Sequence, residues 1–110
     1  MDDTRHALTM RVVEEIVLEA KDDWVGLWEI ISEFMQFALD EATLRQRTLD
    51  VVRVLLDRGF IAGDLTRSPP GFKPWPDQRP EAIIERIRSE WLALGRIPNI
   101  GDIVHFDLPA

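Results

Sequence analysis

The stretch Trp24–Leu39, WVGLWEIISEFMQFAL, has the strongest pattern in the chain. At 100° per residue its polar residues fall within about a third of a helical wheel, and apolar residues cover the rest. A helix that is apolar over so wide an arc has to be covered on several sides. We therefore predict a central core helix here, with one acidic stripe reaching solvent. The stretch is too short and too rich in carboxylates to span a membrane.

Helical periodicity continues on both sides of this stretch. Three further helices are expected, over residues 5–21, from Asp40 to Gly59, and over residues 81–94. Asp22–Asp23 is the expected break and N-cap before the core helix, and Asp40 is the expected cap of the next one. Gly59 and Gly95 fit the position just after a helix, and Pro80 fits a first helical turn.

Two short segments favour strands. Phe60–Ala62 follows the third helix directly, and Asp102–Leu108 is rich in β-branched and aromatic residues, so the two are expected to form a small antiparallel sheet. Between them, Arg67–Pro80 contains five prolines, which exclude a regular helix or a central strand. We predict an irregular, wing-like excursion there, held to the body by Phe72 and Trp75. The expected fold class is α+β and mostly helical.

Composition limits the function classes. A chain of 110 residues fits a single domain over residues 1–110, and it contains no cysteine, which excludes thiolate chemistry and zinc thiolate sites. The net charge of −7 is uneven, because residues 1–41 hold eleven acids against three bases, a local charge of −8. An acidic first third suits a basic protein partner better than phosphate, although acid excess can also serve solubility alone. The N-terminus lacks an apolar signal segment, so a cytoplasmic location is expected.

The junction Leu55–Thr66, LLDRGFIAGDLT, resembles the winged-helix family, in which a third helix ends at glycine and an apolar strand follows at once. The resemblance covers a winged-helix-like core of about residues 5–75. A further helix and strand, over about residues 80–108, lie beyond the usual wing and depart from the family pattern.

This resemblance implies an alternative function as a DNA-binding transcriptional regulator, with the third helix in the major groove. The residues that would contact DNA are Arg45, Arg47, Arg53 and Lys73. Asp50 and Asp57 would then face phosphate, however. Acids and bases that alternate at helical spacing are also typical of an ordinary ion-paired surface.

The chain also resembles small acidic bacterial immunity proteins encoded beside secreted or contact-dependent toxins. DDWVGLWEII (residues 22–31) and EWLALGRIPNIGDIVHF (residues 90–106) carry this resemblance. It implies an inhibitor that occludes the active site of a basic toxin with an acidic surface, and such a surface would also speed encounter. The residues that we expect at this interface are Glu14, Glu15, Asp23, Glu29, Glu33, Gln36 and, as a possible anchor from the proline-rich loop, Trp75. A ring that only holds its own loop is the competing interpretation of Trp75.

No catalytic pattern is present. Adjacent acids such as Glu14–Glu15 diverge by 100° on a helix and do not form a working pair, and no glycine-rich phosphate loop occurs. His105 and Asp107 share a strand face but lack a third metal ligand nearby in sequence. We expect no enzyme activity, no cofactor, no metal and no membrane partner. A small structural protein is the third possibility, and the oligomeric state is open.

Overall fold

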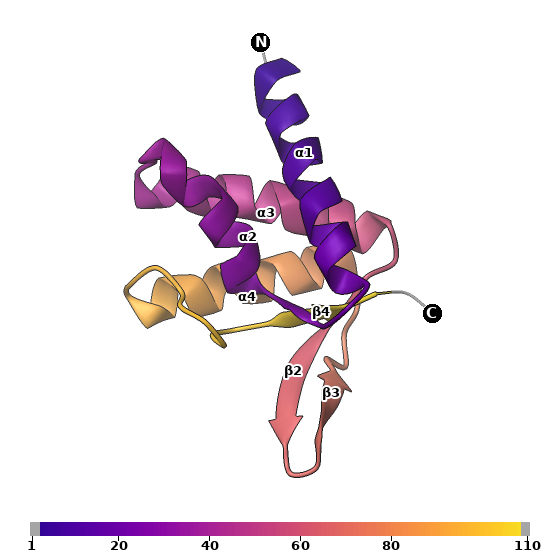
Figure 1. Cartoon of the computed structure of the whole chain (residues 1–110). Helices are drawn as coiled ribbons and strands as arrows, with labels where there is room; N and C mark the ends of the chain where they lie inside the picture. Colours follow the sequence, from indigo (N-terminus) through magenta and orange to yellow (C-terminus); the bar gives the residue numbers. More distant parts are fainter. Residues whose placement is uncertain (1–2, 109–110) are drawn as a thin grey trace.

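The structure is a computed structural model, and it describes residues 3–108. In chain order the elements are α1 (Asp3–Ala20), β1 (Val25–Gly26), α2 (Leu27–Phe34), the 3-10 helix η1 (Met35–Phe37), α3 (Glu41–Asp57), β2 (Ile61–Arg67), β3 (Pro70–Pro74), α4 (Pro80–Leu94) and β4 (His105–Asp107). The described residues therefore form an α+β fold with four α-helices and one small antiparallel sheet, as predicted (Figure 1). None of the helices between residues 3 and 108 has the length and apolar character needed to cross a membrane.

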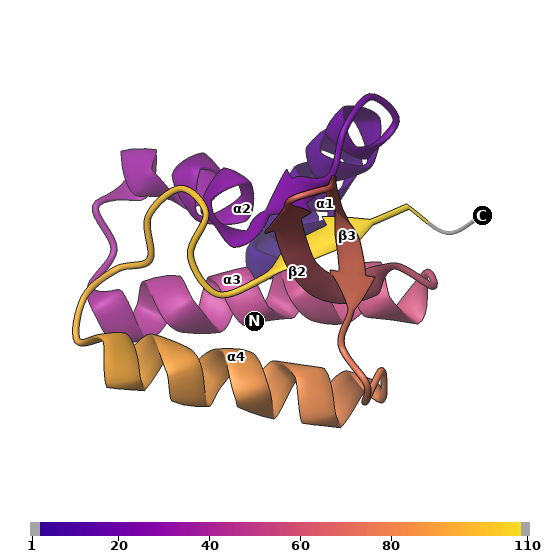
Figure 2. The ribbon, with the colours of Figure 1, turned by 90° about the horizontal axis from the view of Figure 1, so that it is seen from below.

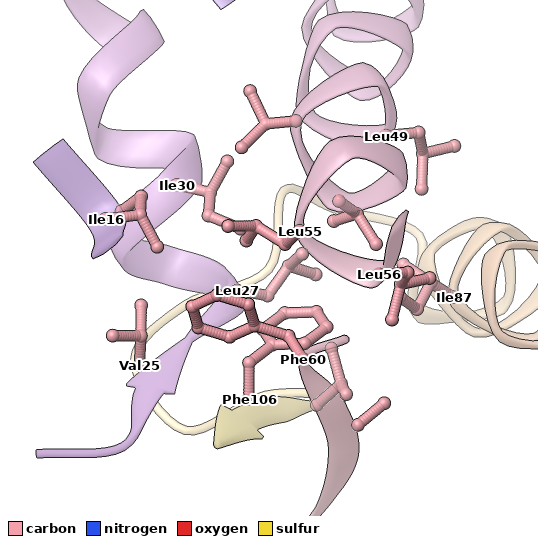
Figure 3. Close-up of a cluster of buried hydrophobic side chains, with 14 of the residues drawn as sticks. Ile16, Val25, Leu27, Ile30, Leu49, Leu55, Leu56, Phe60, Ile87 and Phe106 are labelled. Atoms are coloured by element: carbon pink, nitrogen blue, oxygen red, sulfur yellow. The ribbon is translucent and has the colours of Figure 1, made fainter. Parts of the chain in front are cut away.

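Helix α3 lies at the centre of the helical layer. It contacts α1, α2 and α4, and α4 runs alongside it (Figure 2). Seven of its seventeen residues are buried, and their side chains point to more than one side of the helix. Leu55 and Leu56 meet Leu27, Phe60, Ile87 and Phe106 in one continuous apolar cluster (Figure 3).

The sheet has the order β1-β4-β2-β3, and all neighbours are antiparallel. The predicted pairing of the segment after α3 with the C-terminal strand is confirmed, because Ile61–Gly63 pairs with His105–Asp107. The strand β4 also pairs with Val25–Gly26 on its other side. The sheet extends below the helices in Figure 1, and the hairpin of β2 and β3 projects furthest.

The prediction of one helix over Trp24–Leu39 is wrong at both ends. Val25–Gly26 forms the strand β1, since Val25 pairs with Phe106 of β4, and a helical wheel cannot register such a long-range pairing. Helix α2 begins only at Leu27, and the segment after Phe34 tightens into η1 and ends at Ala38, which has φ 51°. The central core helix is therefore α3, although α2 buries four side chains completely.

The N-cap expected at Asp22–Asp23 is also wrong. The Asp23 carboxylate accepts a hydrogen bond from the Trp24 N–H at 2.8 Å, and α2 starts three residues later after Gly26. The caps of the later helices are confirmed. The Asp40 carboxylate accepts a hydrogen bond from the Thr43 N–H at 2.8 Å, which lowers the pKa of Asp40, and Gly95 ends α4 with φ 73°.

The segment expected to be irregular contains a regular strand. Pro70–Pro74 forms β3, and all five of its residues pair with Gly63–Arg67 of β2. The peptide bond Ser68–Pro69 in the tight connection is cis. The prolines are compatible with a strand because β3 lies at the edge of the sheet, where one side needs no hydrogen-bond donors. The C-terminal strand is shorter than predicted, since a turn at Asp102–Val104 delays it to His105.

Substitutions of Phe34 and Phe37 test whether the buried part of this segment ends at Phe34, the last residue of α2. Phe34 is fully buried, whereas Phe37 is 41% exposed three positions later. We expect Phe34→Ala to lower the free energy of unfolding by about 3–5 kcal/mol, because it leaves a cavity. Phe37→Ala should cost less than about 1 kcal/mol. Urea denaturation of both variants checks this, and equal losses would contradict the boundary.

Thr48 offers a stabilising substitution. Its hydroxyl on α3 is completely buried and has no hydrogen-bond partner within the described residues. Thr48→Val should raise the free energy of unfolding by about 1 kcal/mol, since it removes a desolvated polar group without changing shape. Thr9→Val is the matched control, because the buried Thr9 hydroxyl donates to the Arg5 carbonyl at 3.0 Å. That variant should gain nothing in the same thermal and urea measurements.

Candidate functional site: an acidic surface beside the sheet

The neighbouring helices α1 and α2 place four carboxylates close together. Glu15 and Glu19 lie one turn apart on α1, and Glu29 and Glu33 lie one turn apart on α2. We call these four residues the acidic ridge. Burial raises the pKa of Glu19, and the negative charges of Glu29, Glu33 and Glu15 raise it further. The predicted field of negative charge across the first two helices is therefore present for these four residues.

The carboxylates of the acidic ridge form no ion pair with an arginine of the described residues. Of the carboxylates in residues 3–108, those of Glu14, Asp50, Asp57, Asp77, Glu85, Glu90 and Asp102 form ion pairs with arginines. Glu15, Glu19 and Glu33 have no such partner among the described residues, and Arg11, one turn before Glu15, forms no ion pair there either. Asp22, Asp23, Asp40, Glu41, Asp64, Glu81 and Asp107 also lack an arginine partner among the described residues. The acidic ridge differs from these because its four carboxylates lie close enough to one another to raise the pKa of Glu19.

Glu29 also stabilises the N-terminus of α2. Its Oε1 accepts a hydrogen bond from the Gly26 N–H at 2.6 Å at the start of α2. A side chain added at Gly26 would approach this oxygen to 2.9 Å and the His105 ring to 3.1 Å. Glu29 is therefore tied to the beginning of the helix, and its substitution would affect folding as well as surface charge.

The other predicted interface residues lie in different surroundings. Glu14 lies about 100° around α1 from Glu15. Its carboxylate pairs with Arg58 at 3.0 Å. Gln36 is exposed on η1, and its side-chain amide donates to the Glu33 carbonyl at 3.4 Å. Asp23 is exposed in the turn before β1, where a shallow hollow of about 290 Å³ also contains Asp107.

Trp75 is unavailable as a surface anchor. The ring is only 3% exposed, and its Nε1–H donates to the Asp64 carboxylate at 3.1 Å. The guanidinium of Arg86 lies 3.6 Å from the ring centroid and covers its face. The competing interpretation is therefore supported, since this ring holds the end of β3 against α4.

An aromatic pair that was not predicted from the sequence lies on the face of the sheet that points away from the helices. Trp24 is 37% exposed and stacks on Phe72 with the ring centroids 6.0 Å apart. Gly63 makes this possible, because a Cβ there would lie 2.7 Å from the Phe72 ring. Trp24 precedes β1 directly and lies next to Asp23. The available signal was a glycine diagonally across from an aromatic residue on the neighbouring strand, since Gly63 opposes Pro74 and Phe72 opposes Leu65. This signal can be recognised only when the strand register is known.

His105 lies close to the acidic ridge. Burial lowers its pKa, while the charges of Glu29, Asp64 and Asp23 oppose that shift. The described residues contain no group of three or more histidine, cysteine or acidic side chains arranged to hold a metal ion. His105 and its neighbours thus form a polar contact between the sheet and α2.

The four candidate DNA-binding residues are dispersed. Arg45 extends toward α4, with its guanidinium 6.0 Å from the Trp91 ring centroid, and Arg53 pairs with Asp57 at 3.7 Å. At 100° per residue, Arg47 lies about 200° around α3 from Arg45. Lys73 belongs to the separate hairpin of β2 and β3. No continuous basic surface arises from these residues.

Comparison with protein-family models, with curated protein sequences and with solved structures finds no match to this chain.

Repulsion within the acidic ridge predicts a stabilising substitution at Glu19. Its pKa is raised above 4.5, so its contribution to stability is present below that pH and is lost as the pH rises through the folded-state pKa. Glu19→Gln cannot ionise and should raise the melting temperature at pH 7 by about 2 °C, the size expected from relieving like charges.

At pH 4 the gain from Glu19→Gln should shrink toward zero. Thermal unfolding followed by circular dichroism at both pH values checks this. The matched control is Glu85→Gln, which removes an ion pair with Arg88 and should not stabilise. An equal gain at pH 4 and pH 7 would contradict the electrostatic explanation.

Proposed function

We propose that this chain is a protein-binding inhibitor, specifically an immunity protein that neutralises a basic toxin in the cytoplasm. The supporting observation is the acidic ridge, whose carboxylates lie close enough to raise the pKa of Glu19. Among the described residues, no arginine forms an ion pair with Glu15, Glu19 or Glu33. Folding gains nothing from concentrating repelling charges, so a selective advantage outside folding is the simplest explanation. A basic partner would receive complementary charge and faster encounter from it.

The proposed mechanism is occlusion of a basic substrate cleft. Enzymes that act on nucleic acid carry positive clefts, because neutralising phosphate supplies much of their affinity. The acidic ridge would occupy such a cleft with carboxylates in place of phosphates. The Trp24–Phe72 pair lies toward the same end of α2 and supplies an apolar, aromatic contact of the kind that anchors protein interfaces.

The DNA-binding alternative receives no specific support, because Arg45 contacts Trp91, Arg53 pairs with Asp57, and Lys73 belongs to a separate hairpin. It remains distinguishable in one experiment. Tagged protein captured from the native host at moderate salt would carry DNA that is released as salt rises if the chain were a regulator. An inhibitor would instead carry one stoichiometric basic protein without nucleic acid.

Charge reversal tests the acidic ridge. The triple variant Glu15→Lys, Glu19→Lys and Glu33→Lys leaves the Gly26–Glu29 hydrogen bond intact. We expect it to weaken binding of the captured partner by about a hundredfold or more, with a loss of neutralising activity and of salt dependence. Isothermal titration calorimetry at two salt concentrations, together with an activity assay of the partner, measures this.

The matched control is the triple variant Glu81→Lys, Glu85→Lys and Glu90→Lys, which changes the net charge equally on α4. It should retain binding within about threefold if local rather than net charge matters. Equal losses in both triple variants, or unchanged binding in the first, would reject the acidic ridge as the interface.

A further inference from the structure

The strand β2 is paired unequally along its two sides. On one side its residues Gly63–Arg67 pair with β3, from Gly63 opposite Pro74 to Arg67 opposite Pro70. On the other side, among the strands that the structure describes, only Ile61–Gly63 has a partner, the strand β4. The four residues Asp64–Arg67 therefore have no partner strand from residues 3–108 on the β4 side, and we call this open edge the β2 slot.

The register decides which backbone groups face the β2 slot. The Trp75 N–H donates to the Ala62 carbonyl at 2.9 Å, so the backbone groups of Ala62, Asp64 and Thr66 point toward β3. Those of Leu65 and Arg67 point the opposite way. Within residues 3–108 neither of these two residues has a backbone hydrogen bond on that side. Two N–H groups and two carbonyls are therefore unpaired within the described residues, and they are spaced as an additional strand would require.

A turn in the C-terminal segment keeps the β2 slot open. Continuing the ladder would place Ile103 opposite Leu65, but the Val104 N–H donates to the Asp102 carbonyl at 2.9 Å and Ile103 takes φ 70°. This is a tight γ-turn in a conformation that β-branched residues rarely adopt. Arg96 and the Asn99 N–H bind the Asp102 carboxylate at 2.9 and 2.7 Å and hold the turn in place.

The result is a groove with a volume of about 420 Å³. Its lining comes from the two segments that the turn separates, namely Asp64, Leu65, Thr66 and Arg67 on one side and Ile100, Gly101, Ile103 and His105 on the other. Leu65 is 42% exposed and Ile100 is 74% exposed. The groove thus combines unpaired backbone groups with apolar side chains at its rim.

The edge of the sheet formed by β3 is less able to accept an additional strand. The outward-facing residues of β3 are Pro70, Phe72 and Pro74, and the two prolines have no N–H to offer. An added strand could receive only one N–H donor there. This contrast shows that the chain protects one edge from strand addition and leaves the β2 slot unprotected.

We propose that the β2 slot binds an extended segment of the partner protein as an additional strand, antiparallel to β2 and in line with β4. The inference rests on the proposed function, since it assumes a protein partner. The backbone groups of Leu65 and Arg67 bind the segment, and its apolar side chain packs against Leu65, Ile100 and Ile103. Main-chain pairing of this kind gives affinity, while the apolar contact gives specificity.

The probe is a phage-displayed library of random twelve-residue peptides, selected on the full chain and then synthesised for calorimetry. Leu65→Pro removes the N–H that faces the β2 slot but leaves the pairing of Asp64 and Thr66 with β3 intact. We expect it to weaken the selected peptides at least about tenfold, whereas Leu65→Ala keeps the N–H and should retain binding within about fivefold. Arg67→Pro and Arg67→Ala provide a second matched pair if Leu65→Pro does not fold.

Amide hydrogen exchange gives an independent measurement on the unmodified chain. Bound peptide should slow exchange at Leu65 and Arg67, and leave exchange at Phe72 on the outer edge unchanged. Absence of enriched peptides, equal binding to the proline and alanine variants, or protection at Phe72 would overturn the proposal. A change in mass on ultracentrifugation without peptide would also overturn it, by assigning the edge to a second copy.

The two proposals fail differently. If charge reversal on the acidic ridge abolishes partner binding while Leu65→Pro does not, the inhibitor stands and the β2 slot is rejected. If selected peptides bind through Leu65 and Arg67 but no captured protein is neutralised, the β2 slot stands and the immunity function is rejected.

Discussion

The pairing of β4 between β1 and β2 is the interaction on which the rest of the structure depends. Phe106 of this three-residue strand opposes Val25 on one side and Ala62 on the other, and its own side chain is completely buried in the core. The Leu27 N–H at the start of α2 donates to the Val104 carbonyl just before β4. The last described element thus fixes the direction of α2, the position of the hairpin and the neighbourhood of the acidic ridge.

The sequence alone was sufficient for the elements that local chemistry determines. Asp40 as a cap, Pro80 in a first turn and Gly95 after a last turn act within a few residues, so α3 and α4 were placed nearly to the residue. The segment around Gly26 could not be placed in this way, because its conformation depends on a partner strand eighty residues later. Helical periodicity and strand pairing compete there, and the pairing prevails.

The same distinction applies to the candidate site. The negative charge of the first two helices could be predicted from composition and spacing, and four of the acids do lie together. What spacing could not provide was the pairing of Glu14 with Arg58, the covering of Trp75 by Arg86, or the exposed stack of Trp24 on Phe72. Each of these contacts joins residues from different elements, so each requires the tertiary arrangement.

The late position of β4 has a consequence for the order in which the molecule forms. The strands β1 and β2 leave the ribosome well before the strand that joins them, and pairings across so many residues are slow to establish. The four helices contain most of the buried apolar residues and are complete by Leu94. A nascent chain therefore presents its charged helices and the hairpin of β2 and β3 early, and the four-stranded sheet can close only after His105–Asp107 has emerged.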